Sequence, residues 1–217
     1  MISPKLRHDL AHYARRMHAS GWIANHDGNI SARAGHERIL ITPTAISKAD
    51  TDEAGLVLID LSGQVLEGTR KPPSELDLHL AVYRARPETQ AVVHAHPPTA
   101  TAFGVAGVEM GTPVMPEVAV SLGFVPSAPL TMPKSPESAA AVARLAAEYD
   151  AMLLCGNGAI TLGDSLERAY LRMELVEHYA KILLAARALG GAHPLSREHV
   201  AFLLEARRKV GLGPKGA

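Results

Sequence analysis

The stretch that decides the fold is Ser74–Pro97, which begins Ser-Glu-Leu-Asp-Leu-His and ends Val-Val-His-Ala-His-Pro. A serine followed three residues later by an acid is typical of a helix N-terminus. Ser74 is therefore predicted to cap a helix, and Pro87 to end it. The apolar run over 91–96 then predicts a buried strand. Within this stretch the chain passes from a short helix directly into the interior of a sheet.

Two histidines on this strand, His94 and His96, are separated by a single residue. Alternate residues of a strand project from the same face, so both imidazoles are expected to point the same way. Imidazole pairs suit Zn²⁺ and related ions, and Glu75 at the start of the preceding helix adds a carboxylate. Spacing alone leaves a metal site and a hydrogen-bonded core pair as equal alternatives, and it does not locate a third ligand.

The composition is that of an ordinary globular chain, with 47% apolar and 20% charged residues. The length of 217 residues suits a single domain over 1–217 with a substantial core. Lys plus Arg equals Asp plus Glu, at 22 each, so no global basic field attracts nucleic acid or anionic lipid. No apolar run approaches the ~20 residues that span a bilayer. The single Cys155, expected as a buried strand thiol, fits a reducing cytoplasm. We therefore expect a cytoplasmic protein with no nucleic-acid or membrane partner.

Helices and strands are interleaved along the rest of the chain. Further helices are predicted after Ser3-Pro4, after Ser135-Pro136, from a cap at Asp164 to Gly190-Gly191, and from Ser196 to about Arg208. Further strands are predicted over 38–42, 56–61, 65–66, 151–155 and 159–162. The segment 111–125 follows neither pattern. This alternation predicts a sheet with helices on both of its faces.

An ordered set of motifs points to one family. The motifs, in chain order, are Gly28-Asn-Ile-Ser-Ala-Arg33, Ile41-Thr-Pro-Thr44, Pro73-Ser-Glu75, His94-Ala-His96, and Asn157-Gly158 followed by the Leu162-Gly163 turn. Together they resemble the class II aldolase/adducin family, near the L-fuculose-phosphate and related sugar-phosphate aldolases. The resemblance covers the chain from about Leu6 to Leu189. The ordered set is highly specific, whereas any single motif from it is not.

The resemblance implies an α/β fold with three α/β/α layers and a largely antiparallel central sheet. It also implies a homotetramer whose active sites lie between subunits, with one divalent ion per subunit. Zn²⁺ is the first choice, and Mn²⁺, Co²⁺ and Fe²⁺ are alternatives. His94 and His96 match two of the metal ligands, and Glu75 matches the acid/base glutamate. Because Glu75 opens a helix close to the metal, it is expected to serve either as a ligand or as the base. In such enzymes the ion polarises the substrate and stabilises an enediolate as the carbon–carbon bond breaks.

The third metal ligand departs from the family pattern. Relatives have His-Gly where this chain has Asn157-Gly158. An amide oxygen is a weaker ligand for Zn²⁺ than imidazole, although harder ions such as Mn²⁺ tolerate it. Asn157 is therefore predicted to be the third ligand. Recruitment of His26 or His178, and impaired metal binding, are the alternatives.

The phosphate-binding loop departs from the pattern as well. The residues predicted to bind substrate phosphate are Asn29, Thr44, Ser74 and Lys71. Ala45 stands where family aldolases have glycine. Pro73 stands where they have serine, which removes both a hydroxyl and an N–H donor. Lys71 or Lys48 is expected to restore the positive charge at this loop.

A second candidate catalytic residue is Glu117, which stands where some aldolases have a tyrosine. A carboxylate replaces a phenol as proton donor only if burial raises its pKa.

The predicted activity is an aldolase that cleaves a ketose 1-phosphate, or a close analogue, to dihydroxyacetone phosphate and an aldehyde. A metal-dependent decarboxylase, a sugar-phosphate 4-epimerase and a non-catalytic adducin-like binding module are the alternatives.

Overall fold

The computed structural model describes residues 2–132 and 134–214. Its strands are β1 (Asn29–Arg33), β2 (Arg38–Ile41), β3 (Val57–Asp60), β4 (Val65–Glu67), β5 (Ala91–Ala95), β6 (Ser127–Ala128), β7 (Ala151–Leu154) and β8 (Ala159–Gly163). Its α-helices are α1 (Pro4–Ala19), α2 (Leu76–Ala85), α3 (Pro98–Val105), α4 (Pro116–Ser121), α5 (Pro136–Glu148), α6 (Leu166–Ala188) and α7 (Arg197–Lys209). A 3-10 turn, η1 (Lys48–Asp50), follows β2.

The strands form one sheet in the order β4-β3-β2-β1-β5-β8-β7-β6. Every neighbouring pair is antiparallel except β6 and β7, which run parallel. The register places Asn29 of β1 opposite His94 of β5, and Ala95 of β5 opposite Ala159 of β8. The centre of the sheet therefore brings the histidine strand between the Asn29 strand and the strand that follows Asn157.

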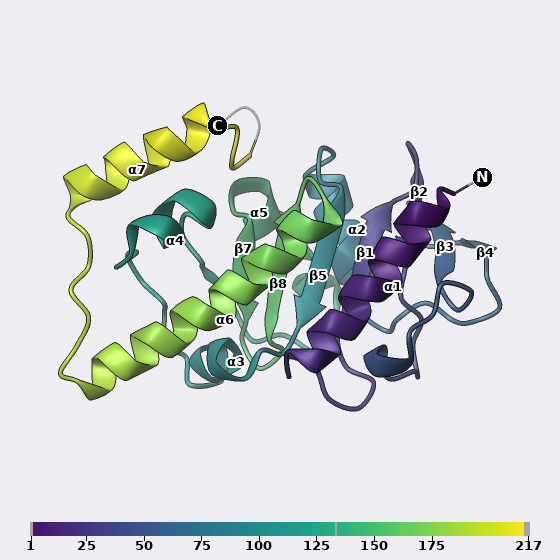
Figure 1. The fold of residues 1–217 in the computed structure, drawn as a ribbon, viewed down its shortest axis with the longest axis horizontal. Coiled ribbons are helices and arrows are strands. Elements are labelled where there is room, and N and C mark those ends of the chain that lie inside the picture. Colours follow the sequence, from purple (N-terminus) through teal and green to yellow (C-terminus); the bar gives the residue numbers. More distant parts are fainter. Residues whose placement is uncertain (1, 133, 215–217) are drawn as a thin grey trace.

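Helices cover both faces of this sheet, as Figure 1 shows. α1 and α6 lie across one face, and α2 and α5 pack together on the other. Val93 of β5 belongs to the core under α1 and α6, whereas Val92 belongs to the core under α2 and α5. A strand buried on both faces has no polar side, which explains the continuous apolar run in its sequence. The predicted three-layer α/β fold with a largely antiparallel sheet is confirmed.

Two predicted helix caps are wrong. Ser74 does not cap α2, because Glu75 takes the N-cap position and no side chain there accepts a hydrogen bond from the helix. Asp164 does not cap α6; Ser165 accepts the hydrogen bond from the Arg168 amide, while Asp164 forms an ion pair with the Arg168 guanidinium. The predicted caps that are confirmed are Ser135 and Ser196. In both errors the neighbouring residue occupies the cap.

The C-terminal helix is fastened to the rest of the fold by Arg207. α7 packs beside α4, beyond the edge of the sheet (Figure 1). Arg207 donates hydrogen bonds to the carbonyls of Val120 and Ser121, at 2.6 and 2.7 Å, and pairs with the buried Asp150. α4 itself occupies part of the segment that the sequence left unassigned.

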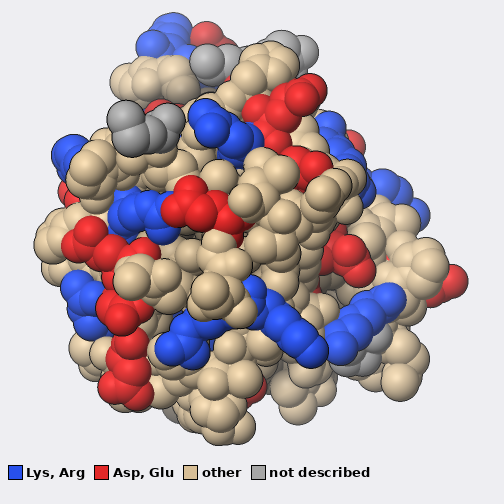
Figure 2. Space-filling model, turned by 90° about the vertical axis from the view of Figure 1, so that its right-hand side faces the viewer, with Lys and Arg blue, Asp and Glu red and all other residues tan. Residues whose placement is uncertain are grey.

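The surface carries both signs of charge. Acidic and basic side chains occur together on the face shown in Figure 2. Within the described ranges, no helix is long and apolar enough to cross a membrane. Cys155 follows β7 and is half-buried, which corrects the prediction of a buried strand thiol.

Candidate active site

Four segments that are distant in sequence meet at one end of the central strands. They supply Glu75 from the start of α2, Asn29 from β1, His94 and His96 from the end of β5, and Asn157 from the turn between β7 and β8. His94 is fully buried, and the Glu75 side chain is 16% exposed. The structure therefore assembles the metal and acid/base residues predicted from the sequence, with Asn29 beside them.

The Glu75 carboxylate is held on both of its oxygens. Asn157 Nδ2 donates to Oε1 at 2.7 Å, and Asn29 Nδ2 donates to Oε2 at 3.2 Å. His94 Nε2 lies 3.1 Å from Oε2. Burial alone would raise the pKa of Glu75, but the charge of His94 and these donors lower that pKa well below its usual range. Glu75 is thus a carboxylate with both oxygens facing donors.

The two histidines each use Nδ1 for an outer contact and leave Nε2 facing inward. His94 Nδ1 lies 3.0 Å from the Ala159 carbonyl oxygen, and His96 Nδ1 lies 3.9 Å from Asp27 Oδ2. A ring N–H that donates to a carbonyl leaves a lone pair on the other ring nitrogen. Metal-binding histidines usually have such an outer carbonyl or carboxylate partner.

The Nε2 atoms of His94 and His96 are buried among polar side chains: His94 Nε2 lies 3.1 Å from Glu75 Oε2, and His96 lies beside Asn157, but neither Nε2 makes a well-aligned hydrogen bond among the described residues. Buried polar atoms are nearly always satisfied, so two imidazole nitrogens with only poorly aligned partners leave room for a further ligand. Burial lowers the pKa of His94, but Glu75 outweighs it and the net pKa is raised. Burial and the charge of His94 lower the pKa of His96. Two inward-facing imidazole nitrogens beside a carboxylate fit a divalent ion.

No third histidine joins His94 and His96 among the described residues. The described part of the chain contains no group of three His, Cys, Asp or Glu side chains arranged to hold a metal. His26 and His178, the two alternatives, are exposed, and neither contacts the cluster. Asn157 lies beside His96, and because its Nδ2 donates to Glu75, its Oδ1 is the atom left to bind an ion. The residues present fit a site of two imidazoles and one amide oxygen.

Two glycines allow the loops to approach the histidine strand. Gly28 and Gly158 have φ values of +64° and +74°. A Cβ on Gly28 would collide with Ile23, and one on Gly158 with the carbonyl of Ala95. Glycine is required at both positions, because other residues rarely adopt positive φ and would not fit.

The predicted phosphate residues lie at the same end of α2, but they differ in accessibility. The Thr44 amide donates to the Lys71 carbonyl at 3.0 Å, which holds their two loops together. Thr44 is half-buried, and Lys71 and Ser74 are exposed. Asn29 is only 3% exposed, and both ends of its amide are engaged, by Glu75 and by His79. Thr44, Ser74 and Lys71 are therefore the side chains still open to a phosphate.

Lys48, the alternative source of charge, is buried rather than exposed. Its side chain is 1% exposed, and Nζ donates to the carbonyls of His26 and Ile46 at 2.9 and 3.2 Å. Burial lowers the pKa of Lys48 to about 8. Lys48 joins the loop before β1 to the loop after β2, which leaves Lys71 as the accessible cation of the pair.

Glu117 is not part of the cluster within one chain. It lies exposed in the first turn of α4, which packs against α7 and α6. The polar contacts to the Glu75 carboxylate come instead from β1, β5 and the β7–β8 turn.

Sequence reasoning missed three residues that support the cluster: Ser31, His79 and Tyr83. They connect Asn29 to the interior between β1 and α2. A usable signal was present, because Glu75, His79 and Tyr83 recur every four residues and so share one helical face.

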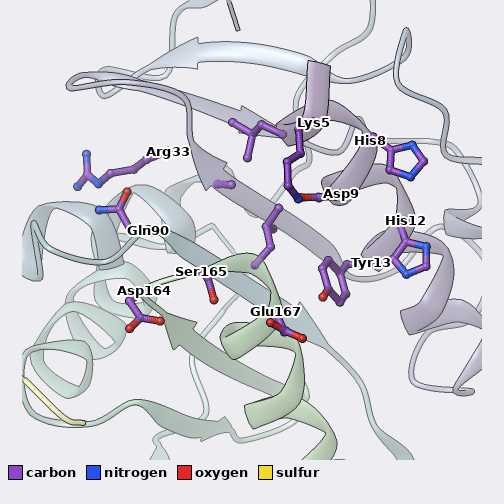
Figure 3. A pocket seen from close by; sticks show the side chains of 13 residues that line it. Lys5, His8, Asp9, His12, Tyr13, Arg33, Gln90, Asp164, Ser165 and Glu167 are labelled. Carbon is purple, nitrogen blue, oxygen red and sulfur yellow. The ribbon is translucent and has the colours of Figure 1, made fainter. Parts of the chain in front are cut away.

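A larger cavity lies away from this cluster. It measures about 700 Å³ and opens between α1 and the start of α6, where Figure 3 shows Lys5, Asp9 and Glu167 along its wall. No predicted site residue lines it. A smaller cavity of about 370 Å³ borders the cluster and is lined by Asn157, Cys155 and the apolar side chains Leu130, Met132, Val142 and Leu154.

The chain matches the family model "Class II Aldolase and Adducin N-terminal domain" over residues 8–184. It belongs to this family. The chain is 32% identical over 186 residues to the 3-oxo-tetronate 4-phosphate decarboxylase of Escherichia coli K12, covering 84% of this chain and 87% of the relative. It is 30% identical over 195 residues to the 5-deoxy-D-ribulose 1-phosphate aldolase of Bacillus thuringiensis, covering 88% and 89%.

Solved structures agree with this assignment. An L-fuculose 1-phosphate aldolase superposes with a TM-score of 0.89 at 27% identity, covering 96% of this chain and 98% of the other. The L-fuculose-1-phosphate aldolase of Thermus thermophilus gives 0.77 at 31% identity, covering 89% and 100%. The named relatives are aldolases and a decarboxylase, and the chain is an enzyme of this class, a carbon–carbon lyase.

Proposed function

We propose that this enzyme is a divalent-metal-dependent aldolase. It cleaves a ketose 1-phosphate, or a close analogue, to dihydroxyacetone phosphate and an aldehyde. The observation that carries the proposal is the ionised Glu75 beside the inward-facing Nε2 atoms of His94 and His96. Aldol cleavage begins when a base takes the proton of the substrate hydroxyl next to the breaking bond. Glu75 is ionised and held in one orientation by two amide donors, so it can accept a proton from a substrate placed against it.

The ligands proposed for one divalent ion per subunit are His94 Nε2, His96 Nε2 and Asn157 Oδ1. When bound, such an ion acts as a Lewis acid that polarises the substrate carbonyl. Zn²⁺ is our first choice, and the amide oxygen of Asn157 makes Mn²⁺ the main alternative. Glu75 would accept the proton of the substrate hydroxyl that becomes the aldehyde oxygen, and would return it to the carbon freed by the bond cleavage, which gives dihydroxyacetone phosphate.

We assign substrate phosphate to Thr44, Ser74 and Lys71, beside the start of α2. Thr44 and Lys71 are held together by a backbone hydrogen bond, and Lys71 supplies the exposed positive charge. Asn29 keeps the Glu75 carboxylate in place and reaches the phosphate only if its amide is released from that role.

We further propose a cytoplasmic homotetramer of single-domain chains with active sites between subunits. Glu117 then serves a site only from a neighbouring subunit, because within its own chain it lies on α4 and makes no contact with the cluster.

A decarboxylase is the second candidate. One observation favours it: the 32% identity to 3-oxo-tetronate 4-phosphate decarboxylase. Loss of CO₂ breaks the carbon–carbon bond without a base, so an ionised Glu75 is less needed at that step.

A product assay separates the two activities. Metal-loaded enzyme is incubated with a panel of ketose 1-phosphates and, separately, with 3-oxo-tetronate 4-phosphate. We expect dihydroxyacetone phosphate from the first reaction, measured by coupled reduction. CO₂ release from the second reaction without dihydroxyacetone phosphate from the first would establish the decarboxylase. Turnover of neither substrate class would contradict both proposed activities.

The phosphate assignment predicts a strong preference for phosphorylated ketoses. Each hydrogen bond to a charged group contributes about 1.5–3 kcal/mol, so losing two of them lowers kcat/KM by at least about 100-fold. The comparison uses one ketose with and without its 1-phosphate. Equal kcat/KM values would contradict the assignment to Thr44, Ser74 and Lys71.

Replacing Asn157 with histidine is expected to tighten Zn²⁺ binding at least about tenfold, because imidazole binds Zn²⁺ better than an amide oxygen. Competition with a chromogenic chelator measures the affinity. The same change removes the donor to Glu75 Oε1, so turnover is not expected to rise. Weaker Zn²⁺ binding in this variant would show that Asn157 does not face the ion.

A further inference from the structure

A buried chain of hydrogen bonds leads from Tyr83 to Glu75. The Tyr83 hydroxyl lies 2.9 Å from Ser31 Oγ, and Ser31 Oγ lies 2.7 Å from His79 Nδ1. His79 Nε2 lies 2.5 Å from Asn29 Oδ1, and Asn29 Nδ2 donates to Glu75 Oε2 at 3.2 Å. The four supporting residues are 3% exposed or less. These four residues do not face the substrate themselves, and any effect on it passes through the Glu75 carboxylate.

Two regular elements bring these side chains together. Asn29 and Ser31 alternate on β1 and therefore share one face of the strand. Glu75, His79 and Tyr83 follow one another at four-residue intervals along α2 and therefore share one face of the helix. α2 packs against β1 with these two faces toward each other, so the side chains from the strand and from the helix alternate along one line of hydrogen bonds.

The Glu75 carboxylate sets the direction of the hydrogen bonds in this line, because it only accepts and therefore faces Asn29 Nδ2, which turns Asn29 Oδ1 toward His79. Asn29 Oδ1 only accepts, so His79 Nε2 carries a hydrogen. Burial lowers the pKa of His79 to about 3, so the ring is neutral and Nδ1 accepts from the Ser31 hydroxyl. Ser31 Oγ then accepts from Tyr83, whose pKa burial raises, so that its hydroxyl stays protonated.

This direction prevents the Asn29 amide from flipping. A flipped amide would turn Oδ1 toward the Glu75 carboxylate and Nδ2 toward the His79 N–H, so that acceptor would face acceptor and donor would face donor. At this depth neither mismatch is relieved by water, and each costs about 1–3 kcal/mol. The chain therefore fixes which atom Asn29 presents to Glu75.

We propose that Tyr83, Ser31 and His79 are positioning residues that lock the Asn29 amide and thereby hold the Glu75 carboxylate against His94. The proposal rests on the acid/base role of Glu75 in the proposed function. Asn157 donates a hydrogen bond to Glu75 Oε1 from a turn, whereas Asn29 donates to Glu75 Oε2 from the buried core. The chain orients Glu75 and does not conduct protons, because a neutral amide is a poor proton carrier.

The test compares two substitutions of His79 that differ in reach. In His79→Gln the side-chain amide nitrogen takes nearly the position of Nε2 and keeps the donor to Asn29. The shorter side chain of His79→Asn loses that donor. We expect His79→Asn to lower kcat about 10- to 100-fold, with KM within about threefold, because misplacing a catalytic group carries penalties of this size. His79→Gln should keep kcat within about threefold of wild type.

Stability and metal content provide the controls. Both variants open the same buried site, so similar losses in unfolding midpoint are expected, and bound metal per chain should match wild type. Equal kcat losses in both variants, in proportion to their stability losses, would overturn the proposal in favour of a packing role. Unchanged kcat in His79→Asn, with Glu75→Gln inactive, would also overturn it. Full activity in Glu75→Gln would instead contradict the proposed function itself, because that function assigns the acid/base role to Glu75.

A measurement independent of activity follows the imidazole itself. In ¹⁵N spectra assigned by comparison with His79→Gln, we expect His79 to be neutral between about pH 5 and 8, with its proton on Nε2. A proton on Nδ1, or a protonated ring in that range, would contradict the hydrogen-bond direction on which the proposal depends. The Tyr83→Phe variant should keep the same tautomer, because Ser31 still donates to Nδ1.

Discussion

Glu75→Gln is expected to lower kcat by about 100- to 10,000-fold, the usual contribution of a general acid or base. Glutamine has nearly the shape of glutamate but cannot accept the hydroxyl proton. Its amide also turns one N–H toward the donors on Asn29 or Asn157, which loosens the side chain. The His94 and His96 Nε2 atoms are unchanged, so the ion stays bound.

The measurement is steady-state kinetics together with elemental analysis of the same samples. Glu174→Gln is the matched control, because it makes the same chemical change on the exposed face of α6. The control should retain wild-type kcat, and both variants should retain bound metal. Wild-type turnover in Glu75→Gln would remove Glu75 from the mechanism, and with it the aldolase assignment.

Removal of metal by a chelator is expected to abolish turnover, and restoring the ion should recover it. Lewis-acid stabilisation of developing charge is worth several kcal/mol, which corresponds to at least about a 1,000-fold loss of rate. Without the ion, two buried Nε2 atoms also lack well-aligned partners, so the unfolding midpoint should fall on chelation.

The ion that restores the most activity reports on the third ligand. An amide oxygen from Asn157 favours a harder ion such as Mn²⁺, whereas Zn²⁺ prefers imidazole at that position. The turnover of chelated wild-type enzyme should be as low as that of His94→Ala. That variant lacks one imidazole ligand, so its turnover should stay low whether or not metal is supplied. Full activity in the presence of excess chelator would contradict the metal-dependent mechanism.

Much of the site could be predicted because it follows from short-range periodicity. The single-residue spacing of His94 and His96 places both rings on one strand face, and the structure keeps them there with their centroids 5.2 Å apart. The continuous apolar run before them predicts a strand buried on both sides, which the two cores on either face of β5 confirm. The ordered motifs predicted the family, and the family model confirms it.

The remaining features depend on tertiary contacts that spacing does not encode. Ser74 looks like a helix cap, but Glu75 occupies that position while its carboxylate turns to His94. His79 looks like a lone histidine on an apolar helix face, and its contacts form only when β1 lies opposite. Asn157 approaches Glu75 because β8 pairs with β5 in one register, which no local pattern specifies.

The most direct test of the central claim is the number of divalent ions per chain, measured by elemental mass spectrometry on untagged protein. The wild type should hold about one ion per chain, and the His94→Ala/His96→Ala double variant should hold none. His178→Ala, which removes an exposed imidazole from α6, should bind as the wild type does. A wild-type protein that binds no ion even after each candidate is added back would contradict the account. Equal metal content in the double variant would contradict it too.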